Sequence, residues 1–417
     1  MKTTKSISAL FILSALINLS CSHDKRNELL TPAYRMNLID SLFNYAVSNH
    51  EIPGAVVYIK RDGKAVFHKA YGYRNLENKV SMCKDDIFRM ASMTKALTAV
   101  AVLQLYERGW LFLDDKVSEY IPEFKNPKVL IDVLPDSSFT SKPASREITI
   151  RQLLTHTSGI GYGFQDEIYN ALIIKNNISE GFEDDNRTSL ENIQRLAKIP
   201  LLHEPGEKYT YGLSYDVLGV VIEKISGMRY DKYIRQYILD PLGMKDSYFI
   251  VPEKEQTRLV TAYQPAETGN GLEPTKYPDT AYPRIKTRQY FSGGADLCST
   301  AEDYGKFIQM VQNGGVYNNT RIIGERFIEM MLSKQTALDD GNYEQGFAAW
   351  VTKAKGAAEG PLADGSFGFG GFWDTYGWAD PKGNFVAVLL LQMYPNNQHK
   401  IHERFQIMTY GVINDLD

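Results

Sequence analysis

The stretch RMASMTKALTAVAVLQL, residues 89–105, carries the strongest structural signal in this chain. The apolar spacing over 96–105 predicts a helix, with Ser92 at its N-terminus and Lys95 on the same face. Unpaired backbone N–H groups and the helix dipole favour developing negative charge at such a position. Burial destabilises an ammonium, so a lysine buried beside a serine can act as its base. The pair therefore has the features of an activated nucleophile.

The same spacing occurs twice more, at Ser22/Lys25 and at Ser81/Lys84. The first pair falls in a polar stretch directly after residues 1–21, which are interpreted below as an export signal. The second lies among polar residues, beside two aspartates that keep a lysine charged. Local context favours Ser92 over both. The local residues also allow the alternative that Ser92 only caps the helix and that Lys95 lies on the surface.

Composition bounds the class of protein. The chain has 417 residues, 46 basic and 50 acidic side chains and a net charge of −4, with no long run of like charge. The sequence therefore has neither the positive net charge nor the basic run that is typical of a nucleic-acid-binding protein. The histidines show no metal-ligand spacing, so we expect no metal and no cofactor. Cys83 and Cys298 are expected to be two free, buried thiols, although a pair in an oxidising compartment stays open.

The N-terminal sequence MKTTKSISALFILSALINLSC, residues 1–21, predicts a secretory signal peptide. It has a basic start, a short apolar run and a small residue before Cys21. It resembles a bacterial lipoprotein signal, in which Cys21 becomes the lipidated first residue; plain secretion is the alternative. Residues 22–33 would then be a tether. We expect an exported bacterial protein, periplasmic or anchored in the outer membrane, that meets the membrane only through its lipid.

Both ends of the remaining chain predict strands and helices. A helix is expected over 35–50, and a hairpin over 54–73 with its turn at Asp62-Gly63. Further strands are expected within 367–393, and a closing helix over 399–413.

The middle of the chain has mostly helical patterns with long connections rich in proline and glycine. We therefore predict an α+β fold (an α/β sandwich) for one domain, residues 34–417. An antiparallel sheet from both chain ends, about 34–85 and 290–417, is flanked by helices. A mostly helical lobe, about 86–290, is inserted, and the active site lies between the two lobes.

Three further motifs follow the first one in order: ITIRQLLTHTSGI (148–160), PGEKYTYGLSYDVLGVVIEKISG (205–227) and SGGADLCSTAEDYGKFIQM (292–310). Together the four resemble the serine β-lactamase and penicillin-binding-protein superfamily. The resemblance is to its class C-like branch of β-lactamases, D-alanyl-D-alanine peptidases and family VIII carboxylesterases. It covers nearly all of residues 35–415.

The resemblance implies that Ser92 is the acylated nucleophile and Lys95 its lysine. The family's Tyr-x-Asn, which follows a Pro-Gly, falls on Tyr211-Gly212-Leu213, so Tyr211 would be the partner base. Tyr209 and Tyr215 have the wrong offset and are interpreted as packing residues. In this family the segment around His156 is structural, and we assign His156 no catalytic role.

Two positions depart from the polar pattern of the β-lactam-binding members. Leu213 stands where the asparagine would be, and Phe369-Gly370-Gly371 replaces Lys-Thr-Gly or His-x-Gly, much like the Trp-Gly-Gly of family VIII esterases. The glycines would let a substrate approach the strand closely. The backbone N–H groups of Ser92 and Phe372 would form the oxyanion hole.

The predicted substrate-binding residues share this edge of the site: Leu213, Phe369, Gly370, Gly371 and Trp373. Tyr376 and Trp378 are further candidates for the pocket wall. Of the three aromatic residues Trp373, Tyr376 and Trp378, one or two are expected to lie in the core. The long segments 161–200 and 249–290 are predicted to be the rims that set substrate choice.

The resulting prediction is a serine hydrolase that forms an acyl-enzyme on Ser92 and acts as a carboxylesterase on small esters. Both departures remove polar groups that a β-lactam carboxylate requires, and an apolar cleft suits a neutral acyl ester better. A β-lactamase, a D-alanyl-D-alanine carboxypeptidase or D-aminopeptidase, an acyltransferase and a non-catalytic binding protein remain alternatives.

Overall fold

The computed structural model describes residues 31–134, 138–182, 186–269, 271–275, 282–336, 341–396 and 400–413. The predicted signal peptide with Cys21 lies outside these residues, as does the tether up to residue 30. In the described ranges, no helix is both long enough and apolar enough to cross a membrane.

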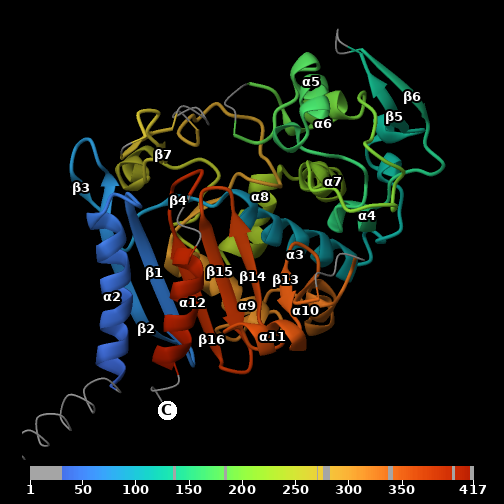
Figure 1. The fold of residues 1–417 in the computed structure, drawn as a ribbon. Coiled ribbons are helices and arrows are strands. Elements are labelled where there is room, and N and C mark those ends of the chain that lie inside the picture. The colour runs from blue at the N-terminus through green and yellow to red at the C-terminus, as the bar shows by residue number, and fades with distance from the viewer. Residues whose placement is uncertain are drawn as a thin grey trace, which may run out of the picture.

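The central element is an eight-stranded antiparallel sheet with the strand order β12-β13-β14-β15-β16-β1-β2-β3. Its strands come from the two ends of the chain, as predicted (Figure 1). They are β1 (Gly54–Arg61), β2 (Lys64–Asn75), β3 (Val80–Ser81), β12 (Tyr343–Gln345), β13 (Trp350–Thr352), β14 (Phe367–Gly371), β15 (Thr375–Asp380) and β16 (Phe385–Leu390). The β1–β2 turn at Asp62-Gly63 has φ angles of 48° and 75°, so this hairpin prediction is confirmed.

Helices cover both faces of the sheet. On one face α2 (Pro32–Ser48) packs against α12 (Lys400–Ile413), and on the other α9 (Ala301–Gln312) packs against β1, β15 and β16 (Figure 1). Both terminal helices are predicted from the sequence. Helix α2 begins two residues before the predicted domain start at 34, because Thr31 caps it by accepting the N–H of Tyr34.

The inserted lobe is mainly helical, as predicted. Its elements are α4 (Ile150–Leu154), α5 (Glu167–Lys175), α6 (Ser189–Leu196), α7 (Ser214–Ser226), α8 (Tyr230–Ile234), the hairpin of β5 (Lys128–Val133) and β6 (Phe139–Pro143), and β7 (Tyr263–Pro265) with β8 (Leu272–Pro274). The β5–β6 hairpin is not among the elements predicted from the sequence. The remaining elements are β4 (Phe88–Arg89), β9 (Cys298–Ser299), β10 (Val316–Tyr317), β11 (Thr320–Arg321), α10 (Glu325–Leu332) and α11 (Ala354–Glu359).

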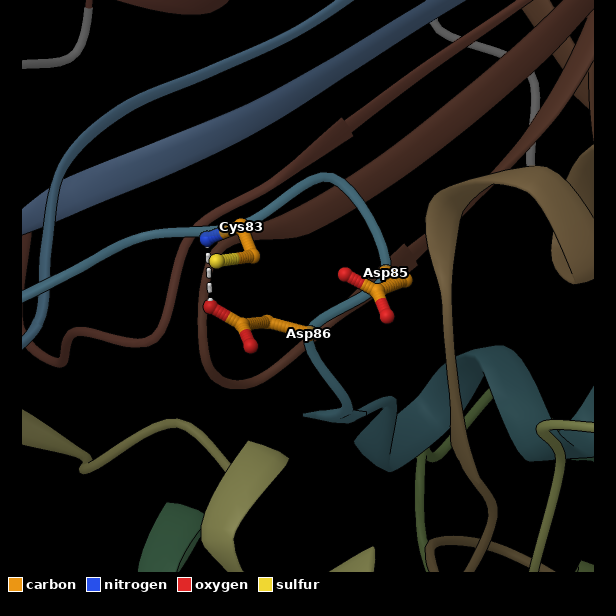
Figure 2. A group of neighbouring side chains, drawn as sticks. All are labelled: Cys83, Asp85 and Asp86. Carbon is orange, nitrogen blue, oxygen red and sulfur yellow. Dashed lines mark hydrogen bonds between the residues drawn. The ribbon is translucent and has the colours of Figure 1, made fainter.

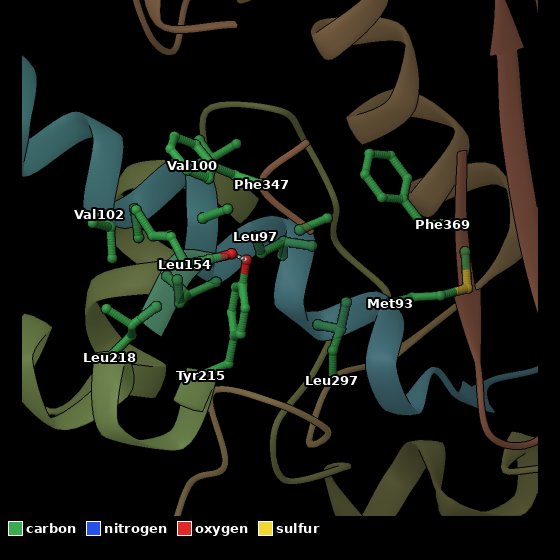
Figure 3. Close-up of a cluster of buried hydrophobic side chains, with 14 of the residues drawn as sticks. Met93, Leu97, Val100, Val102, Leu154, Tyr215, Leu218, Leu297, Phe347 and Phe369 are labelled. Carbon is green, nitrogen blue, oxygen red and sulfur yellow. Dashed lines mark hydrogen bonds between the residues drawn. The ribbon is translucent and has the colours of Figure 1, made fainter. Parts of the chain in front are cut away.

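Helix α3 (Thr94–Glu107) lies at the centre of the molecule. Its residues 94–105 are all buried, because a helix that is apolar on every side can only be stable inside a core. Figure 3 shows this core, in which Phe369 from β14 lies beside Met93. Helix α3 thereby joins the sheet to the inserted lobe.

The two thiols differ from each other. Both are free, and Cys298 is buried as predicted, but Cys83 is exposed, so the prediction for Cys83 is wrong. Cys83 follows the edge strand β3, and the buried position in its loop is taken by Asp86. Asp86 accepts the backbone N–H of Cys83 at 2.6 Å, so the carboxylate and not the thiol occupies the interior of this loop.

Candidate active site

Ser92 lies in a 3₁₀ turn, Ala91–Met93, that leads directly into α3. The preceding Ala91 has a φ of 45°, a left-handed conformation that costs a non-glycine residue of the order of 1–3 kcal/mol. The hydroxyl of Thr94 donates to the Ala91 carbonyl at 2.6 Å and holds this turn. A strained, buried turn therefore presents Ser92 at the start of the central helix.

Lys95 is buried, and its ammonium has a complete set of acceptors. It donates to Ser92 Oγ at 3.1 Å, to Tyr162 Oη at 3.2 Å and to the Gly294 carbonyl at 2.9 Å. An ammonium has three protons, so these three acceptors satisfy it. The arrangement fixes the Lys95 side chain against Ser92.

Tyr211 reaches Ser92 from the inserted lobe, with a distance of 2.7 Å between Tyr211 Oη and Ser92 Oγ. Its loop is tied to the segment after α4, because the N–H of Thr210 donates to the His156 carbonyl at 2.7 Å. At Gly212 a Cβ atom would lie 2.2 Å from the Ile160 carbonyl, so only glycine fits beside Tyr211. The structure thus brings together the three predicted catalytic residues.

His156 supports the Tyr211 loop. Its Nδ1 accepts the Gly212 N–H at 3.4 Å, and its ring lies 4.7 Å from that of Tyr211. Burial lowers the pKa of His156 well below its usual value, so the ring is neutral at neutral pH. Tyr209 packs against the His156 ring, and Tyr215 is a core residue that donates to the Leu154 carbonyl at 2.8 Å (Figure 3). These contacts agree with packing roles for all three.

The two predicted glycines of β14 have different surroundings. At Gly371 a Cβ atom would lie 2.3 Å from the Met90 carbonyl, so glycine is required for β14 to approach the Ser92 turn. At Gly370 the nearest neighbour would be 3.9 Å away, which leaves the strand open on the cavity side. Gly370 is therefore the position at which a substrate can approach the strand.

A cavity of about 380 Å³ opens beside Ser92 at the junction of the two lobes. Its described lining residues are Ser92, Tyr162, Phe164, Gln165, Glu180, Phe182, Tyr211, Ala295, Gly370, Gly371, Phe372 and Tyr394. Aromatic rings and glycines dominate this lining, and none of these residues is a lysine, arginine or histidine. Ser92 and Phe372 both line the cavity, as a shared oxyanion hole requires; that role stays a prediction.

Three of the predicted substrate-binding residues do not line this cavity. Leu213, Phe369 and Trp373 are at most 2% exposed. Leu213 precedes α7 in the main core, and Phe369 points toward α9, against Phe307. Trp373 lies under the Phe372 ring, with the two planes at 89°. Side chains alternate along β14, so Phe369 is directed into the core next to the open position Gly370, whereas Trp373 lies in the turn that follows the strand.

The other two aromatic candidates also pack in or against a core, away from the cavity. Trp378 is fully buried, and Tyr376 stacks on Trp350 with ring centroids 5.8 Å apart. Both pack between the sheet and the terminal helices, on the face away from Ser92. Trp373 and Trp378 are thus buried and Tyr376 is partly buried, which agrees with the expectation that one or two of the three belong to the core.

Tyr162 and Gly294 complete the Lys95 environment, and motif comparison does not single them out. Tyr162 falls in segment 161–200, which the sequence predicts only as a rim. Gly294 belongs to the SGGAD motif, where its carbonyl rather than a side chain makes the contact. The position of Tyr162 directly after the motif at 148–160 is the one local signal that points to it.

A buried ion pair holds the loop that carries Gly294. Arg288 donates to Asp296 at 2.5 Å, both side chains are fully buried, and the same carboxylate accepts the Ser292 N–H at 2.6 Å. Burial raises the pKa of Asp296 to about 6, against the opposing effect of Arg288. The pair therefore ties the acceptor of Lys95 to the interior.

Asp296→Asn is expected to lower the free energy of unfolding by about 3–5 kcal/mol, because it leaves the Arg288 guanidinium buried without its counter-charge. Urea unfolding followed by circular dichroism measures the change. The exposed pair Arg326–Glu329 supplies the control, and Glu329→Gln should change the free energy by less than about 0.5 kcal/mol. Equal effects of the two variants would contradict the structural role of the buried pair.

A second cluster, whose residues do not line the cavity beside Ser92, groups Cys83, Asp85 and Asp86 (Figure 2). Their possible ligand atoms lie within 4.8 Å of one another. Arginines already neutralise the carboxylates: Arg74 pairs with Asp86 at 3.2 Å, and Arg258 with Asp85 at 3.4 Å. We therefore interpret the cluster as part of an ion-pair network beside the sheet edge.

Comparison with known proteins places these features in a family. The model of the Beta-lactamase family matches residues 39–409. The chain is 30% identical to esterase EstB of Burkholderia gladioli, covering 85% of this chain and 89% of EstB. It is 31% identical to the lovastatin esterase of Penicillium rubens, covering 67% and 69% of the two chains.

A solved structure has the same fold. EstCE1, described as a hydrolase with promiscuous acyltransferase activity, superposes with a TM-score of 0.77 at 24% identity, covering 91% of this chain and 98% of EstCE1. At that identity the likeness concerns the fold alone. The sequence motifs, the sheet with its inserted lobe and these comparisons lead to one conclusion: the chain belongs to the beta-lactamase family and is a hydrolase of the β-lactamase fold.

Proposed function

We propose that this protein is an exported serine esterase that cleaves small carboxylic esters through an acyl-enzyme on Ser92. The short distances from Ser92 Oγ to Lys95 and Tyr211 support a nucleophile with two activating partners. The similarity to two proteins named as esterases supports the ester as substrate.

In the proposed reaction, Ser92 Oγ attacks the ester carbonyl carbon and its proton passes to the phenolate oxygen of Tyr211. Lys95 Nζ lies 4.7 Å from the Tyr211 ring centroid, so a positive charge would lie next to the ring that carries this oxygen. The N–H groups of Ser92 and Phe372 receive the negative charge of the tetrahedral intermediate. The C–O bond then breaks, and the alcohol leaves with the proton from Tyr211. Water attacks the acyl-enzyme in the same manner and releases the carboxylic acid.

One observation carries the choice of ester over β-lactam: the cavity beside Ser92 has aromatic rings but no cationic side chain among its described lining residues. Penicillins, cephalosporins and peptides ending in D-alanine all carry a carboxylate that needs a cation or several donors. A neutral ester needs neither, and an apolar cleft binds it by burial.

Purified protein lacking residues 1–21 should hydrolyse p-nitrophenyl acetate and butyrate, and it should turn over nitrocefin and a D-alanyl-D-alanine peptide far more slowly. Rates per active site, with acyl-enzyme mass by mass spectrometry, make the comparison. Faster turnover of nitrocefin than of either ester would overturn the esterase proposal in favour of β-lactamase activity.

Tyr162 acts in this proposal as a positioning residue for Lys95. Tyr162→Phe removes an acceptor from the Lys95 ammonium, and we expect kcat to fall about ten- to hundredfold with little change in KM, the scale of one hydrogen bond to a charged group. Stopped-flow acylation with p-nitrophenyl acetate measures the step directly. A change confined to KM would instead assign Tyr162 to substrate binding.

We also propose that the chain is exported and anchored through Cys21, on the sequence pattern of residues 1–21. In a bacterium that processes lipoproteins, labelled palmitate should enter the wild-type protein and be absent from Cys21→Ser. Unlabelled wild-type protein in the soluble periplasmic fraction would support plain secretion instead.

A further inference from the structure

A second cavity of about 640 Å³ adjoins the cavity beside Ser92. The two share a wall made of five residues: Phe164, Glu180, Phe182, Phe372 and Tyr394. Cavities of 300–1,000 Å³ are large enough to enclose most of a drug-sized molecule. The space beside the nucleophile therefore lies directly next to a larger space, with these five side chains between the two.

The second cavity is mainly apolar. Helix α5 and the residues after it supply Ile173, Ile174 and Ile178 to its lining. Ile174 is 70% exposed and Phe164 is 53% exposed, although both are large apolar side chains. Exposed apolar residues grouped around a cavity are typical of a binding site. The cavity thus presents apolar surface that a ligand group could cover.

The shared wall links this cavity to the predicted oxyanion position. The Phe372 ring stacks on Tyr394, with centroids 3.8 Å apart, and meets the edge of Phe164 at 6.1 Å. The Phe182 ring lies 5.7 Å from the Phe372 ring, tilted by 43°. A substrate whose carbonyl oxygen lies at the backbone of Phe372 would therefore have one substituent directed along this aromatic wall.

Glu180 stands at the junction of the two cavities. One of its carboxylate oxygens accepts the backbone N–H of Gly163, which holds the side chain beside the Phe164 turn. Among the described lining residues of both cavities, Glu180 is the one acidic or basic side chain. The Glu180 carboxylate would repel a negatively charged group of a substrate that passes this point.

We infer that the second cavity takes the larger apolar group of the ester and that Glu180 restricts that group to one without negative charge. This inference rests on the proposed function and names its substrate class. The substrate joins a small group beside Ser92 to a bulky, uncharged apolar group beyond Phe372.

Filling the second cavity tests whether it takes the larger apolar group of the ester. Ile174→Trp should reduce kcat/KM for p-nitrophenyl octanoate or for 2-naphthyl acetate about tenfold more than for p-nitrophenyl acetate, because the new ring takes up space that the large group needs. The octanoate has its large group on the acyl side, and the naphthyl ester has it on the alcohol side. Ile168→Trp is the matched control, since Ile168 is on the same helix and 56% exposed but lines neither cavity. Equal effects of the two tryptophans on all three esters would overturn the assignment.

Removing the charge of Glu180 tests whether this residue excludes negatively charged groups. Glu180→Gln keeps an oxygen that can accept the Gly163 N–H. The readout is the ratio of kcat/KM for mono-p-nitrophenyl adipate, which carries a free carboxylate, to that for its uncharged methyl ester. We expect this ratio to rise about tenfold in the variant. An unchanged ratio would remove Glu180 from substrate selection.

A binding experiment separates this inference from the proposed function. Ser92→Ala protein should bind p-nitrophenyl octanoate by calorimetry about tenfold more tightly than Ser92→Ala/Ile174→Trp protein does. This difference would uphold the cavity assignment even if the wild-type protein hydrolysed no ester. Equal affinities would refute it even if the esterase activity were established.

Discussion

Ser92→Ala is expected to lower kcat for p-nitrophenyl butyrate by about 10⁴-fold or more, the largest effect of any substitution considered for this chain. The substitution removes the atom that forms the acyl bond, and neither Lys95 nor Tyr211 can replace it as a nucleophile at that position. Only the stabilisation of the oxyanion and binding remain. The acyl-enzyme mass should disappear with the activity, and a fluorophosphonate probe should no longer label the protein.

The chain provides its own control, because Ser81 has the same spacing to Lys84 but lies exposed on β3. Ser81→Ala should keep activity within about twofold, in line with the small effects of surface substitutions. Ester hydrolysis that survived in Ser92→Ala at the wild-type rate would mean that another residue is the nucleophile.

Tyr211→Phe should lower kcat by about 10²–10⁴-fold, the range for loss of a general acid–base group. The phenylalanine keeps the ring that packs on His156 at 4.7 Å but lacks the oxygen that lies 2.7 Å from Ser92 Oγ. Binding should change little, so KM stays near its wild-type value. Pre-steady-state acylation rates would show whether the loss is in the step that uses the proton.

Tyr209→Phe is the matched control, since Tyr209 also packs against His156 and is two residues away. Its activity should remain within about threefold of the wild type. If the two variants lost activity equally, the effect would belong to the packing around His156 and not to proton transfer by Tyr211.

Local patterns predict much of this fold. The Asp62-Gly63 turn, the apolar run within 96–105 and the closing helix at the C-terminus are all encoded by neighbouring residues, so periodicity and turn chemistry identify them. The β5–β6 hairpin escapes this approach. Its strands are short and mostly exposed, and they lack the alternation that marks a half-buried strand.

Predictions for side chains near the site are less complete, because burial depends on the partner elements. Gly370, Gly371 and Phe372 line the cavity beside Ser92 as expected. Leu213 and Phe369 have the right positions in the motifs, yet their side chains turn into the core between the lobes. A motif specifies the order of residues, whereas the side of the backbone that faces the cavity follows from how the strand and helix pack.

The sequence by itself determined the family, the two-ended sheet and the Ser92–Lys95 pair, since a separation of three residues on a helix fixes a shared face. The tertiary structure alone decided what surrounds that pair. The contact of Lys95 with the Gly294 carbonyl spans 199 residues, and the wall between the two cavities joins Phe164 and Glu180 to Phe372 and Tyr394. Such contacts form only when distant segments pack together, and no local spacing encodes the volume that they enclose.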